Sequence, residues 1–158
     1  MVRFNYKFER LSGTVFANGN LLYTADGNSI LSPVGNRVSH FDLASNTSRT
    51  LEFECRADIT CMAITGDNRL LICVDATNHA VLVNFTLGIV LHRFSFKKKV
   101  RTIVFSPDDS HFAISYGKHI QVWQTPALRR EFAPFVLHRT YTGQTDDVVM
   151  IRWSPDGR

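Results

Sequence analysis

The stretch VRTIVFSPDDSHFAISYGKHIQVWQ, residues 100–124, predicts three short β-strands joined by two tight turns. Apolar and β-branched residues gather in three runs, at 101–105, 111–115 and 120–123. Ser106-Pro107-Asp108-Asp109 separates the first two runs, because proline presets φ for a turn and aspartate side chains bond nearby backbone N–H groups. Tyr116-Gly117-Lys118 separates the last two, where glycine can adopt a positive φ.

The same unit recurs along the chain. It is marked by four turn aspartates spaced 41, 41 and 48 residues apart: Asp26, Asp67, Asp108 and Asp156. A second marker follows the first three aspartates by 15, 16 and 15 residues: Phe41, Val83 and Trp123. A period of about 40–45 residues with four short strands per copy is typical of a WD-repeat β-propeller, so we predict an all-β propeller fold.

These markers divide the chain into blades. We expect blade 1 at about residues 19–54, blade 2 at about 59–96, blade 3 at about 100–141 and the start of a fourth blade at 148–158, with an outer closing strand at 2–8. A closed propeller needs about 4–8 blades. We therefore expect an incomplete N-terminal part of a larger propeller. Because its end blades would expose apolar faces and strand edges, we expect that a polypeptide of these residues alone is not a stable monomer.

Some predicted elements rest on weaker signals. We expect a turn at 32–36, the outer strand of blade 1 at 50–54 and that of blade 3 near 132–141. The spacer at 125–131 is expected to hold a helical turn, with Pro126 early in it. Residues 148–153 should form the first strand of blade 4.

Composition limits the class of protein. With 44% apolar and 20% charged residues, the 158-residue chain is globular rather than disordered. Its net charge of +4 permits nucleic-acid contact without requiring it. No apolar run reaches the ~18 residues of a membrane span. Three cysteines without CxxC spacing (Cys55, Cys61 and Cys73) fit a reducing compartment.

The sequence contains no recognisable catalytic motif. The nucleotide-binding, nucleophile-elbow and zinc-protease patterns are absent. The recurring aspartates belong to neighbouring blades and are best explained by turn chemistry. The six histidines are scattered without metal-ligand spacing. We therefore predict neither an enzyme nor a cofactor, metal or small-molecule site.

Two basic sets are candidates for contact with nucleic-acid phosphates. The first lies in the loop between blades 2 and 3 and contains Lys97, Lys98, Lys99 and Arg101. The second is a looser set near the outer strand of blade 3 and contains Arg129 and Arg130, with His138 and Arg139 beside them. Clustered cations can neutralise phosphates without reading bases. The alternative is a solvated loop that discourages edge pairing.

Several segments resemble the periodic tryptophan proteins, WD-repeat proteins of the small-subunit processome. They are FERLSGTVFANG (8–19), DGNSILSPVGNRVSHFDL (26–43), AVLVNFTLGIVLHRFSF (80–96), VFSPDDSHFAISYGKHIQVWQTP (104–126) and REFAPFVLHRTYTG (130–143). The chain departs from the usual repeat, since Phe41 and Val83 stand where Trp123 stands in the third copy, and the Gly-His pair ahead of each repeat is absent.

The resemblance implies a non-catalytic scaffold of the nucleus and nucleolus that acts in ribosomal RNA processing. The implied partners are other WD-repeat subunits of the UtpB subcomplex, small nucleolar ribonucleoprotein and the 5′ external transcribed spacer of the ribosomal RNA precursor. Fold alone does not fix function. The residues by themselves leave open a propeller adaptor of another complex, such as a ubiquitin-ligase receptor or a vesicle coat.

Overall fold

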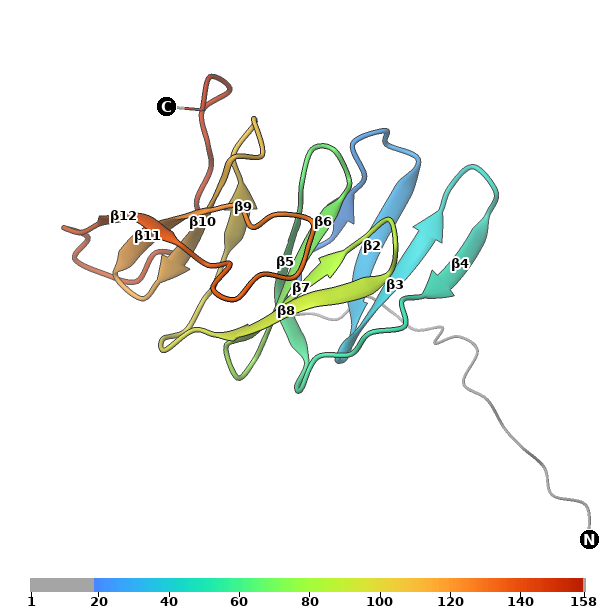
Figure 1. The fold of residues 1–158 in the computed structure, drawn as a ribbon, viewed down its shortest axis with the longest axis horizontal. Helices are drawn as coiled ribbons and strands as arrows, with labels where there is room; N and C mark the ends of the chain where they lie inside the picture. Colours follow the sequence, from blue (N-terminus) through green and yellow to red (C-terminus); the bar gives the residue numbers. More distant parts are fainter. Residues whose placement is uncertain (1–18, 158) are drawn as a thin grey trace, which may run out of the picture.

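The computed structural model describes residues 19–157, which form three antiparallel four-stranded sheets and no helix. The sheets stand side by side as successive blades (Figure 1). Blade 1 contains β1 (Leu22–Tyr23), β2 (Ser29–Val34), β3 (Arg37–Asp42) and β4 (Thr47–Thr50). Blade 2 contains β5 (Ile59–Ile64), β6 (Leu70–Asp75), β7 (His79–Asn84) and β8 (Ile89–Ser95). Blade 3 contains β9 (Ile103–Phe105), β10 (His111–Tyr116), β11 (His119–Gln124) and β12 (Leu137–Tyr141).

Each blade is a meander in which successive strands pair. The sheet orders are β1-β2-β3-β4, β5-β6-β7-β8 and β9-β10-β11-β12. The predicted all-β, WD-repeat propeller fold is therefore confirmed, as an open and partial propeller. The predicted strand at 2–8 lies outside the described residues.

The apolar core lies between blades rather than within one sheet. One cluster joins blades 1 and 2 and includes Leu31, Val38, Met62 and Val81, all at most 1% exposed. A second joins blades 2 and 3, where Phe112 and Ile114 pack with residues of blade 2. A propeller blade is therefore stabilised mainly by its neighbour, since each buries one sheet face against the next.

The first half of blade 1 corrects a predicted turn. Residues 32–36 were expected to form the turn, but β2 continues to Val34 and only Gly35 and Asn36 connect it to β3. Pro33 is tolerated in β2 because the pairing with β1 extends only as far as Leu31. No residue of β1 therefore lies opposite Pro33 to accept a bond from a backbone N–H there. Gly35 supplies the positive φ, 61°, of this two-residue turn.

The outer strand of blade 1 was placed too late in the chain. The ladder of β4 covers Thr47–Thr50, and the predicted 50–54 segment instead crosses towards blade 2. Its alternating residues Leu51, Phe53 and Cys55 are buried in the cluster between blades 1 and 2. The alternation therefore reflects burial of one side of a crossing segment, which keeps only isolated backbone bonds to its neighbour, from Leu51 N to Val38 O and from Cys55 N to Asn36 O, both at 2.9 Å.

The end of blade 3 differs from the prediction in three respects. The spacer at 125–131 contains bends and no helical turn. The outer strand β12 begins at Leu137, because Phe135 turns inward to pack on Phe94 and Phe112. Residues 148–153 run beside β9 without strand pairing, since a β-strand requires a hydrogen-bonded partner strand and none of the described residues provides one.

Candidate nucleic-acid interface

The strand ends form two rims of the partial propeller (Figure 1). The β4–β5 and β8–β9 connections and the β2–β3, β6–β7 and β10–β11 turns share one rim, which we call the lysine rim. The β1–β2, β5–β6 and β9–β10 turns share the opposite rim with the β3–β4 and β7–β8 turns. We call this second rim the aspartate rim, because it carries the repeated turn aspartates.

The lysine loop, Lys97–Lys99, is held at both ends by buried residues. Phe96 is 4% exposed and Val100 is 2% exposed. Asn78 fixes both anchors, since its carbonyl accepts from Phe96 N at 2.9 Å and its side chain accepts from Val100 N at 3.3 Å. Anchoring of the neighbours leaves the three lysines exposed on the rim.

The four cations of this predicted set are not equivalent. Lys98 Nζ lies 5.5 Å from the centroid of the Tyr116 ring, a cation–π contact. Arg101 Nη2 lies 3.7 Å from Asp147 Oδ2, with both side chains about half exposed. Lys97 and Lys99 are therefore the members best placed to meet a phosphate.

The second predicted basic set lies at the other end of β8. Arg130 donates to the carbonyl of Val90 at 3.2 Å, near the start of that strand, whereas Lys97 follows its end. Arg129 forms an ion pair with Glu131 at 3.1 Å. The structure thus separates the two basic sets and partly neutralises the second.

The repeated aspartates each occupy a turn on the aspartate rim. A buried hydroxyl two residues earlier donates to the carboxylate: Thr24 to Asp26 at 2.5 Å, Thr65 to Asp67 at 2.6 Å and Ser106 to Asp108 at 2.5 Å. These hydroxyl donors lower the pKa of Asp26 and that of Asp108, the latter to about 2. Asp156 lies in the turn closed by the bond from Gly157 N to Ser154 O.

The residue after each turn aspartate has a positive φ, between 57° and 72°: Gly27, Asn68, Asp109 and Gly157. In two copies this residue links neighbouring blades. Asn68 Oδ1 accepts from Ala25 N at 2.9 Å, and the Asp109 carboxylate accepts from Gly66 N and Asp67 N at 2.8 and 3.1 Å. The turns are thus joined across the aspartate rim. Neither these acceptors nor the buried hydroxyls were predicted from the sequence.

The second repeat markers occupy one position on the third strand of each blade. Phe41 pairs with Ile30, Val83 with Leu71, and Trp123 with Phe112. Trp123 packs edge-on against Phe94 and Phe96 of blade 2. In blades 2 and 3 this position therefore faces the preceding blade, and it is filled there by a β-branched or a large aromatic side chain.

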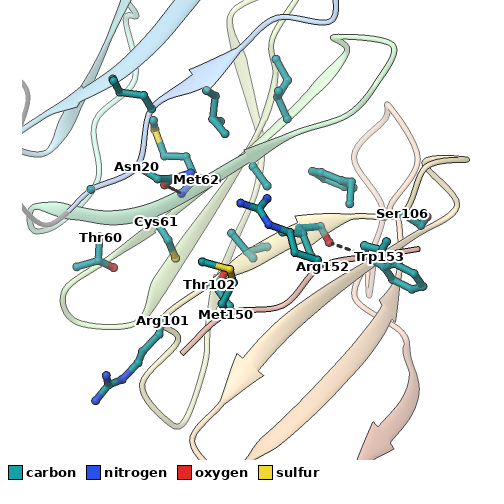
Figure 2. Close-up of a pocket in the computed structure, with 18 of the residues that line it drawn as sticks. Asn20, Thr60, Cys61, Met62, Arg101, Thr102, Ser106, Met150, Arg152 and Trp153 are labelled. Carbon is teal, nitrogen blue, oxygen red and sulfur yellow. Dashed lines mark hydrogen bonds between the residues drawn. The ribbon is translucent and has the colours of Figure 1, made fainter. Parts of the chain in front are cut away.

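A cavity of about 690 Å³ opens on the inner strands β1, β5 and β9 (Figure 2). Asn20 holds β5 in place there, since its amide donates to Met62 O at 2.9 Å and accepts from Met62 N at 2.7 Å. Asp109 is the one carboxylate among the lining residues, and it is engaged by the neighbouring turn. The described lining therefore contains no acid–base pair.

The part of the chain that the structure describes also bears on metal ligation, cysteine reactivity and membrane insertion. No group of His, Cys, Asp and Glu there could hold a metal ion. Cys55, Cys61 and Cys73 are free and buried, and burial raises the pKa of Cys55 and of Cys61 to about 12. Within residues 19–157, no helix is long and apolar enough to cross a membrane.

Comparison with known proteins supports the propeller. A family model described as "WD domain, G-beta repeat" matches residues 88–124, which run from the β7–β8 turn to the end of β11. The hydrazine synthase of Kuenenia stuttgartiensis superposes with a TM-score of 0.71 at 16% identity, over 92% of this chain and 42% of that one. U3-55K superposes with a TM-score of 0.69 at 15% identity, over 89% and 43%. Identities this low show the fold alone.

Sequence relatives are far more similar. The chain is 52% identical over 155 residues to the periodic tryptophan protein 2 homolog of Schizosaccharomyces pombe, covering 97% of this chain and 18% of that protein. It is 45% identical over 156 residues to periodic tryptophan protein 2 of Saccharomyces cerevisiae, covering 98% and 17%. It is 43% identical over 157 residues to the mouse homolog, covering 99% and 17%. The chain thus spans less than a fifth of the length of these relatives.

The three blades, their turns and the family model together define a WD-repeat β-propeller protein, of which these residues form an open part. Within that class, the chain is homologous over nearly its whole length to the proteins named periodic tryptophan protein 2 in fungi and mouse. The resemblance to periodic tryptophan proteins noted in the sequence is confirmed.

Proposed function

We propose that this chain forms part of a non-catalytic scaffold of the small-subunit processome that acts in ribosomal RNA processing in the nucleolus. The observation that carries the proposal is the 52% identity to a periodic tryptophan protein 2 homolog over 97% of the chain. The proposed partners are other WD-repeat subunits of the UtpB subcomplex, small nucleolar ribonucleoprotein and the 5′ external transcribed spacer.

The surface chemistry is consistent with a scaffold. Carboxylates of the aspartate rim are engaged in turns and links between blades, as at Asp108 and Asp109, rather than paired for acid–base work. The lysine loop projects three exposed cations from a fixed base. We propose that this loop contacts RNA phosphates, because its backbone is already fixed and its exposed cations can neutralise phosphates without reading bases.

The salt dependence of RNA binding tests the phosphate contact. Each phosphate neutralised on single-stranded RNA contributes a slope of about −0.7 to the logarithm of affinity against the logarithm of salt. Changing Lys97, Lys98, Lys99 and Arg101 to Ala should weaken binding of a spacer RNA and flatten that slope. We expect the slope to become shallower by about 1.4, which corresponds to two phosphate contacts. Lys97 and Lys99 are the two members of the set that lack a ring or carboxylate contact among the described residues.

A matched variant separates a local contact from an effect of net charge. Arg129→Ala with Arg130→Ala removes two cations at the other end of β8, where Glu131 and the Val90 carbonyl already engage them. That variant should retain most of the wild-type slope. An unchanged slope in the four-residue variant would rule out phosphate contact by the lysine loop.

A further inference from the structure

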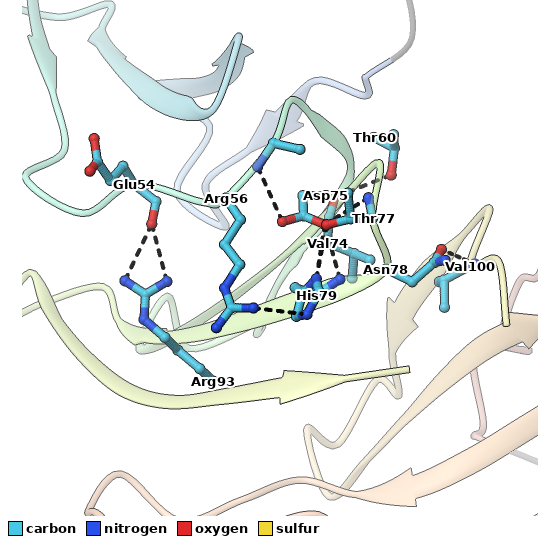
Figure 3. A network of polar contacts seen from close by, with 11 residues as sticks. Glu54, Arg56, Thr60, Val74, Asp75, Thr77, Asn78, His79, Arg93 and Val100 are labelled. Carbon is cyan, nitrogen blue, oxygen red and sulfur yellow. Dashed lines mark hydrogen bonds and ion pairs between the residues drawn. The ribbon is translucent and has the colours of Figure 1, made fainter. Parts of the chain in front are cut away.

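A small basic pocket lies between the β4–β5 connection and the β7–β8 hairpin of blade 2, and the lysines of the lysine loop do not line it. Its volume is about 210 Å³, and its lining residues are Arg56, His79, Ala80, Val81, Arg93, Phe94 and Ser95. Two guanidinium groups and one imidazole thus meet in it, and none of the described lining residues carries a carboxylate; the Asp75 carboxylate lies behind the lining, 3.9 Å from His79 Nδ1. Figure 3 shows Arg56 and Arg93 reaching in from the β4–β5 connection and from β8.

The β7–β8 ladder brings two of these groups to one face. His79 pairs with Ser95, and Val81 pairs with Arg93, so all four side chains lie on the same side of the sheet. Val81 is 1% exposed and belongs to the cluster between blades 1 and 2. The rigid core beneath therefore fixes the pocket floor.

Arg56 is oriented by a chain of hydrogen bonds that begins at a buried carboxylate (Figure 3). The Thr77 hydroxyl donates to Asp75 Oδ1 at 2.7 Å and lies 2.8 Å from His79 Nδ1. With Nδ1 donating to that hydroxyl, His79 Nε2 accepts from Arg56 Nη1 at 3.2 Å. Burial raises the pKa of Asp75, but hydrogen bonds from Thr77, His79 and Ala57 outweigh it and hold that pKa below its usual value.

Arg93 is held by a different contact. Both of its Nη atoms donate to the Glu54 carbonyl at 3.3 Å. The Glu54 carboxylate is directed to Arg37 at 2.7 Å and does not neutralise the pocket. Since a guanidinium has five N–H donors, Arg56 and Arg93 each retain donors for an anion.

The geometry points to a site for the phosphate group of a phosphorylated serine or threonine in a partner protein. Arginine clusters recognise such groups through charge-assisted hydrogen bonds. A phosphomonoester carries a charge of about −1.5 to −2 and enters end-on from a flexible side chain. An RNA phosphodiester carries one charge and is flanked by two riboses, so it suits the exposed lysine loop better than a walled pocket of this size.

Phosphorus NMR line broadening of a small probe tests the assignment with the full-length protein. The probe is N-acetyl-phosphoserine N-methylamide, and a ten-nucleotide oligouridylate serves as competitor. We expect saturable broadening with the wild type and at least a tenfold weaker affinity in Arg56→Gln. Ser95→Asp should have the same effect by placing a carboxylate at an exposed edge of the pocket.

Arg69→Gln is the matched control, because Arg69 is an exposed arginine of the β5–β6 turn, paired with Asp67, outside the pocket. It should bind the probe as the wild type does. Absence of broadening with the wild type would overturn the assignment. Wild-type broadening in Arg56→Gln and Ser95→Asp would also overturn it, as would a loss of affinity in Arg69→Gln as large as that in the pocket variants. A third contrary result is a wild type that binds oligouridylate but not the phosphoserine probe, with the oligouridylate affinity lost in Arg56→Gln.

Discussion

At the scale of single residues, the turns depend on a buried hydroxyl and an exposed carboxylate acting together. Ser106 is 4% exposed, donates to Asp108 and to the carbonyl of His111, and accepts from His111 N. The hydroxyl therefore bonds to the turn carboxylate and to both backbone groups of His111, the first residue after the turn. The aspartates could be predicted from turn chemistry, but the hydroxyls were missed. Their signal, a Ser or Thr two residues before each aspartate, was present in the sequence.

Removing one hydroxyl should change the titration of its carboxylate. In Ser106→Ala, we expect the pKa of Asp108 to rise from about 2 towards its ordinary value, since the strongest donor is lost. Because the folded-state pKa is depressed, Asp108 stabilises the fold above its ordinary pKa, and this contribution disappears as pH falls towards about 2. Wild type should therefore resist acid unfolding to a lower pH than Ser106→Ala.

Carboxyl-carbon NMR titration and an acid-unfolding curve measure the two effects. Ser95→Ala is a suitable control, because it removes an exposed hydroxyl outside this turn. An Asp108 titration that is the same in Ser106→Ala and wild type would show that the hydroxyl bond does not set the pKa.

At the scale of elements, turns on neighbouring blades match one another as donor and acceptor. Asn68 and Asp109 accept from backbone N–H groups of the preceding turn. In the next pair, Gly157 has no side chain to accept a bond and Pro107 has no N–H, so the bond from Gly66 N to Asp109 has no counterpart. These side-chain links are therefore found in the two pairs that supply an acceptor side chain after the turn aspartate. They join residues 42–43 positions apart, which local sequence patterns do not reveal.

Asp109→Gly isolates one such link. Glycine tolerates the φ of 57° at this position, so the substitution removes the carboxylate without backbone strain. The amides of Gly66 and Asp67 should exchange faster with solvent, and the free energy of unfolding should fall by about 1 kcal/mol. Asp109→Asn retains an acceptor, so its amide exchange rates and its free energy of unfolding should lie between those of wild type and Asp109→Gly. Unchanged exchange at both amides in Asp109→Gly would contradict a stabilising link.

Strands were predicted correctly where turn signals and periodicity agreed. They were predicted wrongly where alternating apolar residues pack between blades. Residues 51–55 alternate like a strand, but they bury Leu51 and Phe53 between blades and do not form a continuous strand. The basic pocket was also missed. His79 and Arg93 reach one face only through the β7–β8 register, and a shift by one residue would separate them.

At the scale of the whole molecule, the described residues leave apolar side chains exposed at both end blades. Beyond blade 3, Ala113 and Val122 are covered by the segment that carries Ile151 and Trp153, in which Val149 and Met150 are 68% and 67% exposed. On blade 1, Tyr23 is 62% exposed. Apolar surface and unpaired strand edges of this kind promote association.

A polypeptide of residues 1–158 alone should therefore self-associate or melt without cooperativity. Light scattering after size-exclusion chromatography measures its mass, and circular dichroism follows its melting. The matched comparison is a longer polypeptide with a complete set of blades. A monodisperse monomer with a sharp melt would show that three blades suffice.

The proposed function is tested most directly by purifying the full-length protein from nuclear extract and identifying the proteins and RNA that accompany it. The scaffold proposal predicts other WD-repeat processome subunits together with ribosomal RNA precursor that contains the 5′ external transcribed spacer. Recovery of ubiquitin-ligase or vesicle-coat subunits without precursor RNA would leave the propeller in place and contradict the proposed function.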